Sequence, residues 1–148
     1  MSYLQLVYHA VIRTKMSEPT LSLEHSDELY RYIWGIIKNK NSVLFRINGM
    51  EEHVHILFSL HPTISLSDFM RELKVETSKM LKKTTGFEQF TAWGEGYAAL
   101  TYSYRDKNII TNYIKNQREH HKTVSFREEY VNLLKEMELE LDERDWNK

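Results

Sequence analysis

The sequence predicts an α+β domain, a ferredoxin-like split β-α-β with an antiparallel sheet and helices on one face. Three observations predict it. Four segments alternate apolar and polar residues with the period of two that strands show, and two long segments between them repeat apolar residues at helical spacing. The resulting order is β-α-β-β-α-β, and a third helix and a C-terminal tail helix follow it.

The first four elements come from the first 60 residues. Residues 3–14 alternate well enough to be a strand. A helix is predicted over 27–40, with Ser26 as its N-cap because a hydroxyl there can accept a hydrogen bond from the first turn. Strands are predicted over 42–49 and 53–60, and the short "GMEE" link between them predicts a hairpin.

The second half of the chain is mostly helical. A helix is predicted over 65–83, because Ser65 opens a capping-box-like start and an apolar stripe follows. Residues 93–104 give a glycine-rich entry and a fourth strand. The third helix is predicted over 106–121 and the tail helix over 125–141.

Composition excludes several classes of protein. A chain of 148 residues fits one ordinary domain, and no apolar stretch approaches the roughly 18–20 residues that a membrane span needs. No secretory leader is recognisable at the start. The absence of cysteine excludes disulfides, thiolate catalysis and cysteine-based zinc sites, and it fits a cytoplasmic protein.

The net charge of −1 is unevenly distributed along the chain. Residues 128–148 carry −5, and the preceding 127 residues carry +4. A mildly basic body with an acidic tail permits a polyanionic partner without requiring one.

Two histidines stand one residue apart in the third strand, within "EEHVHILFSL" (51–60). Side chains alternate across a strand, so His53 and His55 share one face and both could reach one metal ion. The alternative is a pair of partly exposed histidines on a solvated face, because His-x-His alone is a common tripeptide.

A second group of polar residues lies on the predicted third helix, in "NYIKNQREHH" (112–121). Tyr113 and Gln117 are four residues apart and therefore lie on one helix face. A tyrosine there could simply pack. A buried amide without a partner costs free energy, and a metal ion would satisfy the carbonyl oxygen of Gln117. A metal that polarises a phosphodiester beside a tyrosine permits attack by the phenol oxygen on phosphorus.

These motifs resemble the single-tyrosine HUH transposases of the smallest bacterial insertion sequences. The His-hydrophobic-His motif of "MEEHVHILFSL" and the Tyr-x-x-x-Gln of "YIKNQ" carry the resemblance. Further similar segments, in the same order, are "YHAVIRTK", "HPTISLSDFMRELK", "WGEGYAALTYSY" and "NQREHHKTVSFREEYVNLLKE". Relatives commonly have Pro-Asp before the first histidine, where this chain has Glu51-Glu52.

The resemblance implies a homodimer that cuts and rejoins single-stranded DNA with hairpin ends, using Mg²⁺ or Mn²⁺. It implies that His53, His55 and Gln117 are metal ligands and that Tyr113 is the nucleophile of a 5′-phosphotyrosine intermediate. In such dimers the tyrosine helix commonly serves the histidine pair of the other subunit. Residues 1–122 would then be the catalytic domain, with 123–148 as its helical tail.

Other basic residues are candidates for DNA contact. The polar face of the 65–83 helix is either solvated or a phosphate-contacting surface, and its candidates are Lys74, Lys79, Lys82 and Lys83. His120 and His121 are expected to contact DNA or to cap the helix end rather than to bind metal.

Three other functions stay open at this point. A domesticated relative would use the same chemistry on repeated genomic hairpins. A hairpin DNA-binding protein would bind without turnover, and a small metal sensor would bind metal without DNA.

Overall fold

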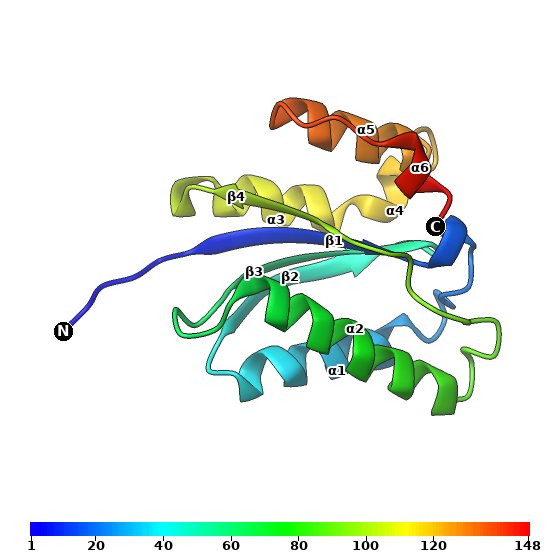
Figure 1. The fold of residues 1–148 in the computed structure, drawn as a ribbon, viewed down its shortest axis with the longest axis horizontal. Coiled ribbons are helices and arrows are strands. Elements are labelled where there is room, and N and C mark those ends of the chain that lie inside the picture. Colours follow the sequence, from blue (N-terminus) through cyan, green and yellow to red (C-terminus); the bar gives the residue numbers. More distant parts are fainter.

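The computed structural model describes residues 1–148 and contains one four-stranded sheet (Figure 1). Its strands are β1 (Val7–Arg13), β2 (Val43–Gly49), β3 (His53–Ser59) and β4 (Ala98–Tyr102), in the order β2-β3-β1-β4. Every neighbouring pair is antiparallel. The predicted α+β fold with a ferredoxin-like strand order is therefore confirmed.

Two helices cover the first face of the sheet, α1 (Ser26–Asn39) and α2 (Leu66–Lys83). Their apolar stripes pack on alternate residues of the central strands, such as Ile12 and Ile56, and form the larger core. Ser65 caps α2 as predicted, because its hydroxyl accepts a hydrogen bond from the backbone N–H of Asp68.

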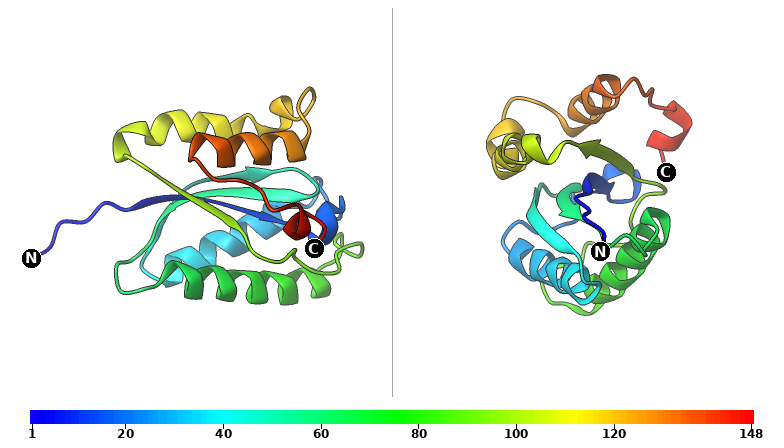
Figure 2. Two further views of the ribbon diagram at one scale, coloured as in Figure 1. Left: turned by 45° about the horizontal axis from the view of Figure 1, so that its top comes forward. Right: turned by 90° about the vertical axis from the view of Figure 1, so that its left-hand side faces the viewer.

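The two helices of the split β-α-β thus lie on one face of the sheet, as predicted, and the helices that follow them lie on the other. The second face carries the remaining helices: α3 (Lys107–Lys115), α4 (Gln117–His120), α5 (Phe126–Glu136) and α6 (Glu143–Trp146) (Figures 1 and 2). The reason is that β1 and β3 are buried on both faces along nearly their whole length. Strands with two buried faces need cover on both sides. This second layer forms the functional site.

Several element boundaries differ from the prediction. Ser26 is the first residue of α1 and not its N-cap; its hydroxyl donates to the carbonyl of Leu23 instead. Residues 1–6 precede β1, and the fourth strand begins only at Ala98. The third helix is interrupted at Asn116, and the tail helix ends at Glu136.

The β2–β3 hairpin brings two backbones unusually close together at Gly49. A Cβ atom there would lie 2.1 Å from the carbonyl oxygen of His53 and 2.9 Å from the Cα of Val54. Only glycine lacks a Cβ, so this position allows the approach. The contact fixes the start of β3, which carries the histidine pair.

The chain contains no helix with the length and apolar composition that crossing a membrane requires.

Candidate active site

His53 and His55 lie side by side on β3, on the face covered by the second helical layer. Both are fully buried, and pairing with β1 fixes their positions, with Arg13 opposite His53 and Val11 opposite His55. The ring of His53 stacks on Phe126 of α5, with centroids 4.0 Å apart and planes at 9°. The predicted shared face is confirmed, whereas the alternative of a solvated face does not hold.

A buried carboxylate faces the histidine pair. Glu129 comes from the first turns of α5, and its side chain is almost fully enclosed. Its Oε1 atom lies 3.0 Å from Nε2 of His55, 3.3 Å from Nε2 of His53 and 3.1 Å from Nε2 of His121. Three imidazole nitrogens therefore converge on one carboxylate oxygen.

Gln117 completes this group of side chains. Its Oε1 atom lies 3.0 Å from Nε2 of His53 and 2.9 Å from Nε2 of His121. Its amide nitrogen donates to Oε2 of Glu129 at 2.6 Å. The predicted ligands His53, His55 and Gln117 are thus brought together, and His121 and Glu129 join them. We call these five residues the histidine cluster.

The hydrogen-bond pattern of the histidine cluster fits a cation. Nδ1 of His53 faces a carboxylate oxygen of Glu52 at 2.6 Å, and Nδ1 of His121 faces the carbonyl of Val124 at 2.7 Å. In a neutral ring at either position the hydrogen would therefore be on Nδ1. In that form the lone pair of each Nε2 atom points at oxygen atoms of Gln117 and Glu129, and a shared divalent cation would satisfy all of these atoms.

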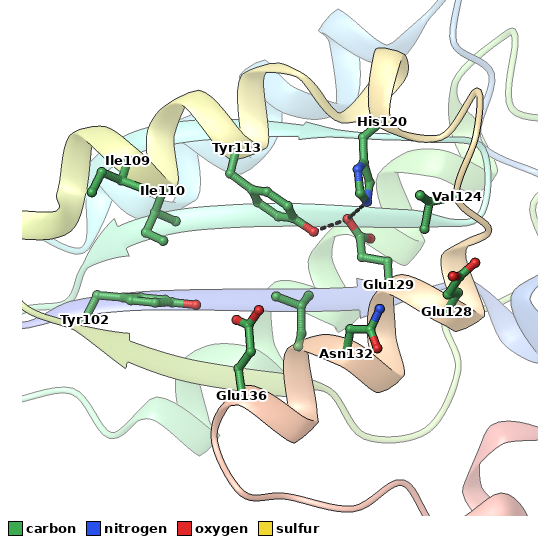
Figure 3. A pocket seen from close by; sticks show the side chains of 11 residues that line it. Tyr102, Ile109, Ile110, Tyr113, His120, Val124, Glu128, Glu129, Asn132 and Glu136 are labelled. Carbon is green, nitrogen blue, oxygen red and sulfur yellow. Dashed lines mark hydrogen bonds and ion pairs between the residues drawn. The ribbon is translucent and has the colours of Figure 1, made fainter.

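Tyr113 of α3 reaches the same carboxylate from the other side. Its hydroxyl donates to Oε2 of Glu129, as Figure 3 shows. Its ring lies edge-on to that of His55, with centroids 5.9 Å apart. Asn48 of β2 holds this helix in place, because its side-chain amide donates to the carbonyls of Ile114 and Lys115. One chain thus brings the tyrosine to its own histidine pair.

Burial and charge shift the pKa values of these groups in opposite directions. Burial lowers the pKa of His55 to about 4. Burial also disfavours the charged form of His53, but hydrogen bonds to Glu129 and Glu52 outweigh it and raise the pKa of His53. Hydrogen bonds from the histidines outweigh the burial of Glu129 and lower its pKa. Burial and the charge of Glu129 raise the pKa of Tyr113, so the phenol keeps its proton at neutral pH without a further positive charge.

His9 of β1 lies directly behind the histidine cluster. Its Nε2 atom is 2.7 Å from Nδ1 of His55, and its Nδ1 atom is buried without a hydrogen-bond partner. Burial lowers the pKa of His9 to about 3, so the ring is neutral at pH 7. A neutral ring in this place orients His55 from outside the cluster.

The lysines predicted to contact DNA lie on α2, across the sheet from the histidine cluster (Figure 1). Lys74 donates to the carbonyls of Gly94 and Gly96 and so holds the loop before β4. The side chains of Lys79, Lys82 and Lys83 are on the surface, and their contact with DNA stays a prediction. His120 lies 3.5 Å from Glu129, at the edge of the histidine cluster.

Sequence reasoning missed Glu129, His9 and the position of His121. Glu129 was one acid among the eight that make the tail acidic. A signal was nevertheless present, because Glu129 stands three residues after Phe126 and four before Leu133, within the apolar stripe of α5. A carboxylate at such a position is buried and needs partners. No comparable pattern marks His9.

The family model described as "Transposase IS200 like" matches residues 2–117. The chain belongs to this family. The chain is 25% identical over 122 residues to the ISDra2 transposase TnpA of Deinococcus radiodurans, and the match covers 78% of this chain and 86% of that protein.

Two solved structures resemble the fold of this IS200-like transposase family member. A crystal structure of a protein from Deinococcus radiodurans R1 superposes with a TM-score of 0.58 at 26% identity, covering 79% of this chain and 95% of the other. A REP-associated tyrosine transposase bound to a REP hairpin superposes with a TM-score of 0.60. At 14% identity, over 84% of this chain and 76% of the other, it supports the fold alone.

Proposed function

We propose that this family member cuts and rejoins single-stranded DNA at element ends through a phosphotyrosine intermediate on Tyr113. The observation that carries the proposal is the position of its hydroxyl. It is hydrogen-bonded to a carboxylate that also contacts Gln117 and the histidines of β3. A tyrosine that serves only in packing is not expected to place its hydroxyl among buried potential metal ligands.

Five side chains would hold the divalent metal: His53, His55, Gln117, His121 and Glu129. Imidazole nitrogens combined with carboxylate and amide oxygens accept Mn²⁺ readily and Mg²⁺ less so. The bound ion would supply positive charge that stabilises the oxygens of the reacting phosphodiester and the phenolate. The set differs from the one expected from sequence by the addition of His121 and Glu129.

The protein's own groups carry out the bond changes. The hydrogen bond to Oε2 of Glu129 orients the phenol of Tyr113; the phenol gives up its proton to water as its oxygen attacks the phosphorus atom. A tyrosine–phosphorus bond forms as the bond to the 3′ oxygen breaks, and that oxygen leaves as a 3′ hydroxyl after taking up a proton. The 5′ phosphate stays on Tyr113. Attack by another 3′ hydroxyl reverses these changes and rejoins the DNA.

We further propose single-stranded DNA with hairpin ends as the substrate, a homodimer as the working assembly and the cytoplasm as its location. Because Glu129 lies beyond residue 122, the catalytic unit includes the first part of the tail. The nucleophile and the histidine cluster of one chain lie together, which supports an active site completed by residues of a single protomer within that homodimer.

The test is a covalent adduct that survives denaturation. Single-stranded DNA from the flanks of this gene is incubated with Mn²⁺ or Mg²⁺ and with wild type, Tyr113→Phe or Tyr32→Phe. Tyr32 is a matched control, because it is a partly exposed tyrosine on α1, across the sheet. We expect a metal-dependent adduct with wild type and Tyr32→Phe and none with Tyr113→Phe. Binding of the hairpins without any adduct would instead favour a DNA-binding protein without turnover.

A further inference from the structure

A cavity of about 320 Å³ opens directly beside the nucleophile (Figure 3). It lies between α3 and α5, next to the edge strand β4. Tyr113 and Glu129 line it together with residues from all three elements. The hydroxyl that would attack DNA is therefore next to a space that nothing described so far uses.

Most of the cavity wall away from the Tyr113 hydroxyl and His120 is unsuited to a phosphate group. Ile109, Ile110 and Leu133 supply apolar surface, and Tyr102 adds an aromatic ring. The lining contains no lysine or arginine, but it contains the carboxylates of Glu128, Glu129 and Glu136. An anion would be repelled by these carboxylates, so the occupant is uncharged or carries hydrogen-bond donors.

Two polar side chains at the rim have no partner within the chain. Glu136 and Asn132 make no side-chain hydrogen bond or ion pair, and Figure 3 shows both on α5 at the border of the cavity. The charge of Glu136 helps to raise the pKa of Tyr102 and of Tyr113, which places its carboxylate near both phenols. These rim groups can accept hydrogen bonds from a ligand.

We infer that this cavity binds an unpaired nucleobase of the DNA that Tyr113 cuts, the base of the nucleotide on the 3′ side of the break. The inference rests on the proposed function and names a specificity site for it. A base is flat and uncharged, its faces suit apolar and aromatic walls, and its edge carries N–H donors. The volume lies at the lower end of the roughly 300–1,000 Å³ typical of small-molecule sites, which suits one base.

The choice of nucleotide follows from the direction of attack. In an in-line displacement the leaving 3′ oxygen departs on the side opposite the tyrosine oxygen and takes its own nucleotide away. The nucleotide on the 3′ side keeps the phosphorus and remains bonded to Tyr113. Its base is therefore the one nearest to the walls beside the phenol.

The experiment varies both the base and the cavity. Oligonucleotides from the gene's flanks carry each of the four bases, or an abasic site, on the 3′ side of the cut. The cavity is narrowed by Ile109→Trp, and its rim is changed by Glu136→Gln. Ile109 is 67% exposed, so a larger side chain there costs little folding. Matched controls are Val75→Trp, at a 46% exposed position of α2, and Glu24→Gln, at an exposed acid before α1.

We expect the abasic substrate to lower the adduct yield of wild type on the order of tenfold, the size of one lost base contact. Ile109→Trp should cause a similar loss on the intact substrate and little further loss on the abasic one. Glu136→Gln should shift the preference away from bases that present an amino group. Both control variants should behave as wild type.

The same oligonucleotides are titrated onto Tyr113→Phe, with and without Ile109→Trp. Because this variant cannot form the adduct, the titration measures how much the base contributes to binding affinity. If wild type forms adducts but neither the base nor Ile109→Trp changes yield or affinity, the cavity assignment is wrong and the proposed function stands. If no adduct forms with any substrate but affinity depends on the base and on Ile109, the proposed function fails and the cavity assignment stands.

Discussion

Replacing Glu129 with glutamine should destabilise the metal-free protein measurably. The carboxylate accepts hydrogen bonds from Tyr113 and from Gln117 and faces three imidazoles. A hydrogen bond to a charged group contributes about 1.5–3 kcal/mol. The amide has one acceptor oxygen where the carboxylate has two, so about one such bond is lost, and one N–H is left facing other donors at a further cost of about 1–3 kcal/mol. Relief from burying a charge returns part of this, which leaves a net loss of about 2–4 kcal/mol.

The assay is thermal and urea unfolding in EDTA at pH 7.5, with Glu140→Gln as the control. Glu140 is an exposed acid of the same tail without an ion pair, so its replacement changes the charge equally. For a domain of this size the loss corresponds to a melting temperature about 5–10 °C below that of wild type. Equal stability of the two variants would refute the position of Glu129 in the histidine cluster.

Adding Mn²⁺ separates a ligand from a purely structural group. A ligand that binds only the folded state stabilises it by about 2.7 kcal/mol at a hundred times its Kd. We expect wild type to gain more stability from Mn²⁺ than Glu129→Gln does, because the amide supplies no negative charge. An identical gain in both proteins would show that Glu129 is not a ligand.

Three further predictions concern the surroundings of the histidine cluster. Gly49→Ala should lower the free energy of unfolding by about 1–3 kcal/mol, because the new methyl group meets the backbone of His53. Urea unfolding should show this loss and Mn²⁺ titration should show weaker metal binding. An unchanged midpoint of urea unfolding would contradict the close approach of the two backbones. Phe126→Ala should cost about 3–5 kcal/mol and weaken metal binding, since it removes the ring stacked on His53, and calorimetry with and without Mn²⁺ would measure both. Metal-free protein should lose stability as the pH falls from about 6.5 to about 4, because in this range histidines of the unfolded chain bind protons while the buried His9 and His55 of the folded protein stay neutral. The pKa of His55 lies about 2.5 units below its unfolded value, which is worth about 3 kcal/mol, and the raised pKa of His53 offsets part of this loss. A free energy of unfolding in urea that does not change with pH would contradict the prediction.

The fold could be predicted from the sequence because its signals are local. Period-two and helical patterns, together with the capping hydroxyl of Ser65, placed the first six elements in order. Boundaries failed where short-range backbone geometry, which neither periodic pattern encodes, decides them. Ser26 uses its hydroxyl on a loop carbonyl, and Glu138 takes a left-handed backbone conformation (φ 58°) just after the tail helix.

The candidate site was only partly predictable for a different reason. Alternation along β3 places His53 and His55 on one face whatever lies above them. Glu129 and His121 join them only because α4 and α5 fold back over the sheet, and His9 contributes through the pairing of β1 with β3. These are contacts between segments far apart in the sequence, and no spacing rule in a single chain records them.

The hydrogen bond between His9 and His55 links metal binding to tautomerism. With no cation present, His55 can donate from Nε2 to Glu129 while its Nδ1 accepts from Nε2 of His9, and the partnerless Nδ1 of His9 carries no hydrogen. A cation on Nε2 of His55 requires the opposite arrangement, with both hydrogens shifted by one nitrogen. His9 would then hold an N–H group in a dry interior, at a cost of about 1–3 kcal/mol. Cation binding would thus reverse the direction of the hydrogen bond between the two rings. The nitrogen chemical shifts of His9 would then report whether the metal site is occupied, although His9 does not contact the ion.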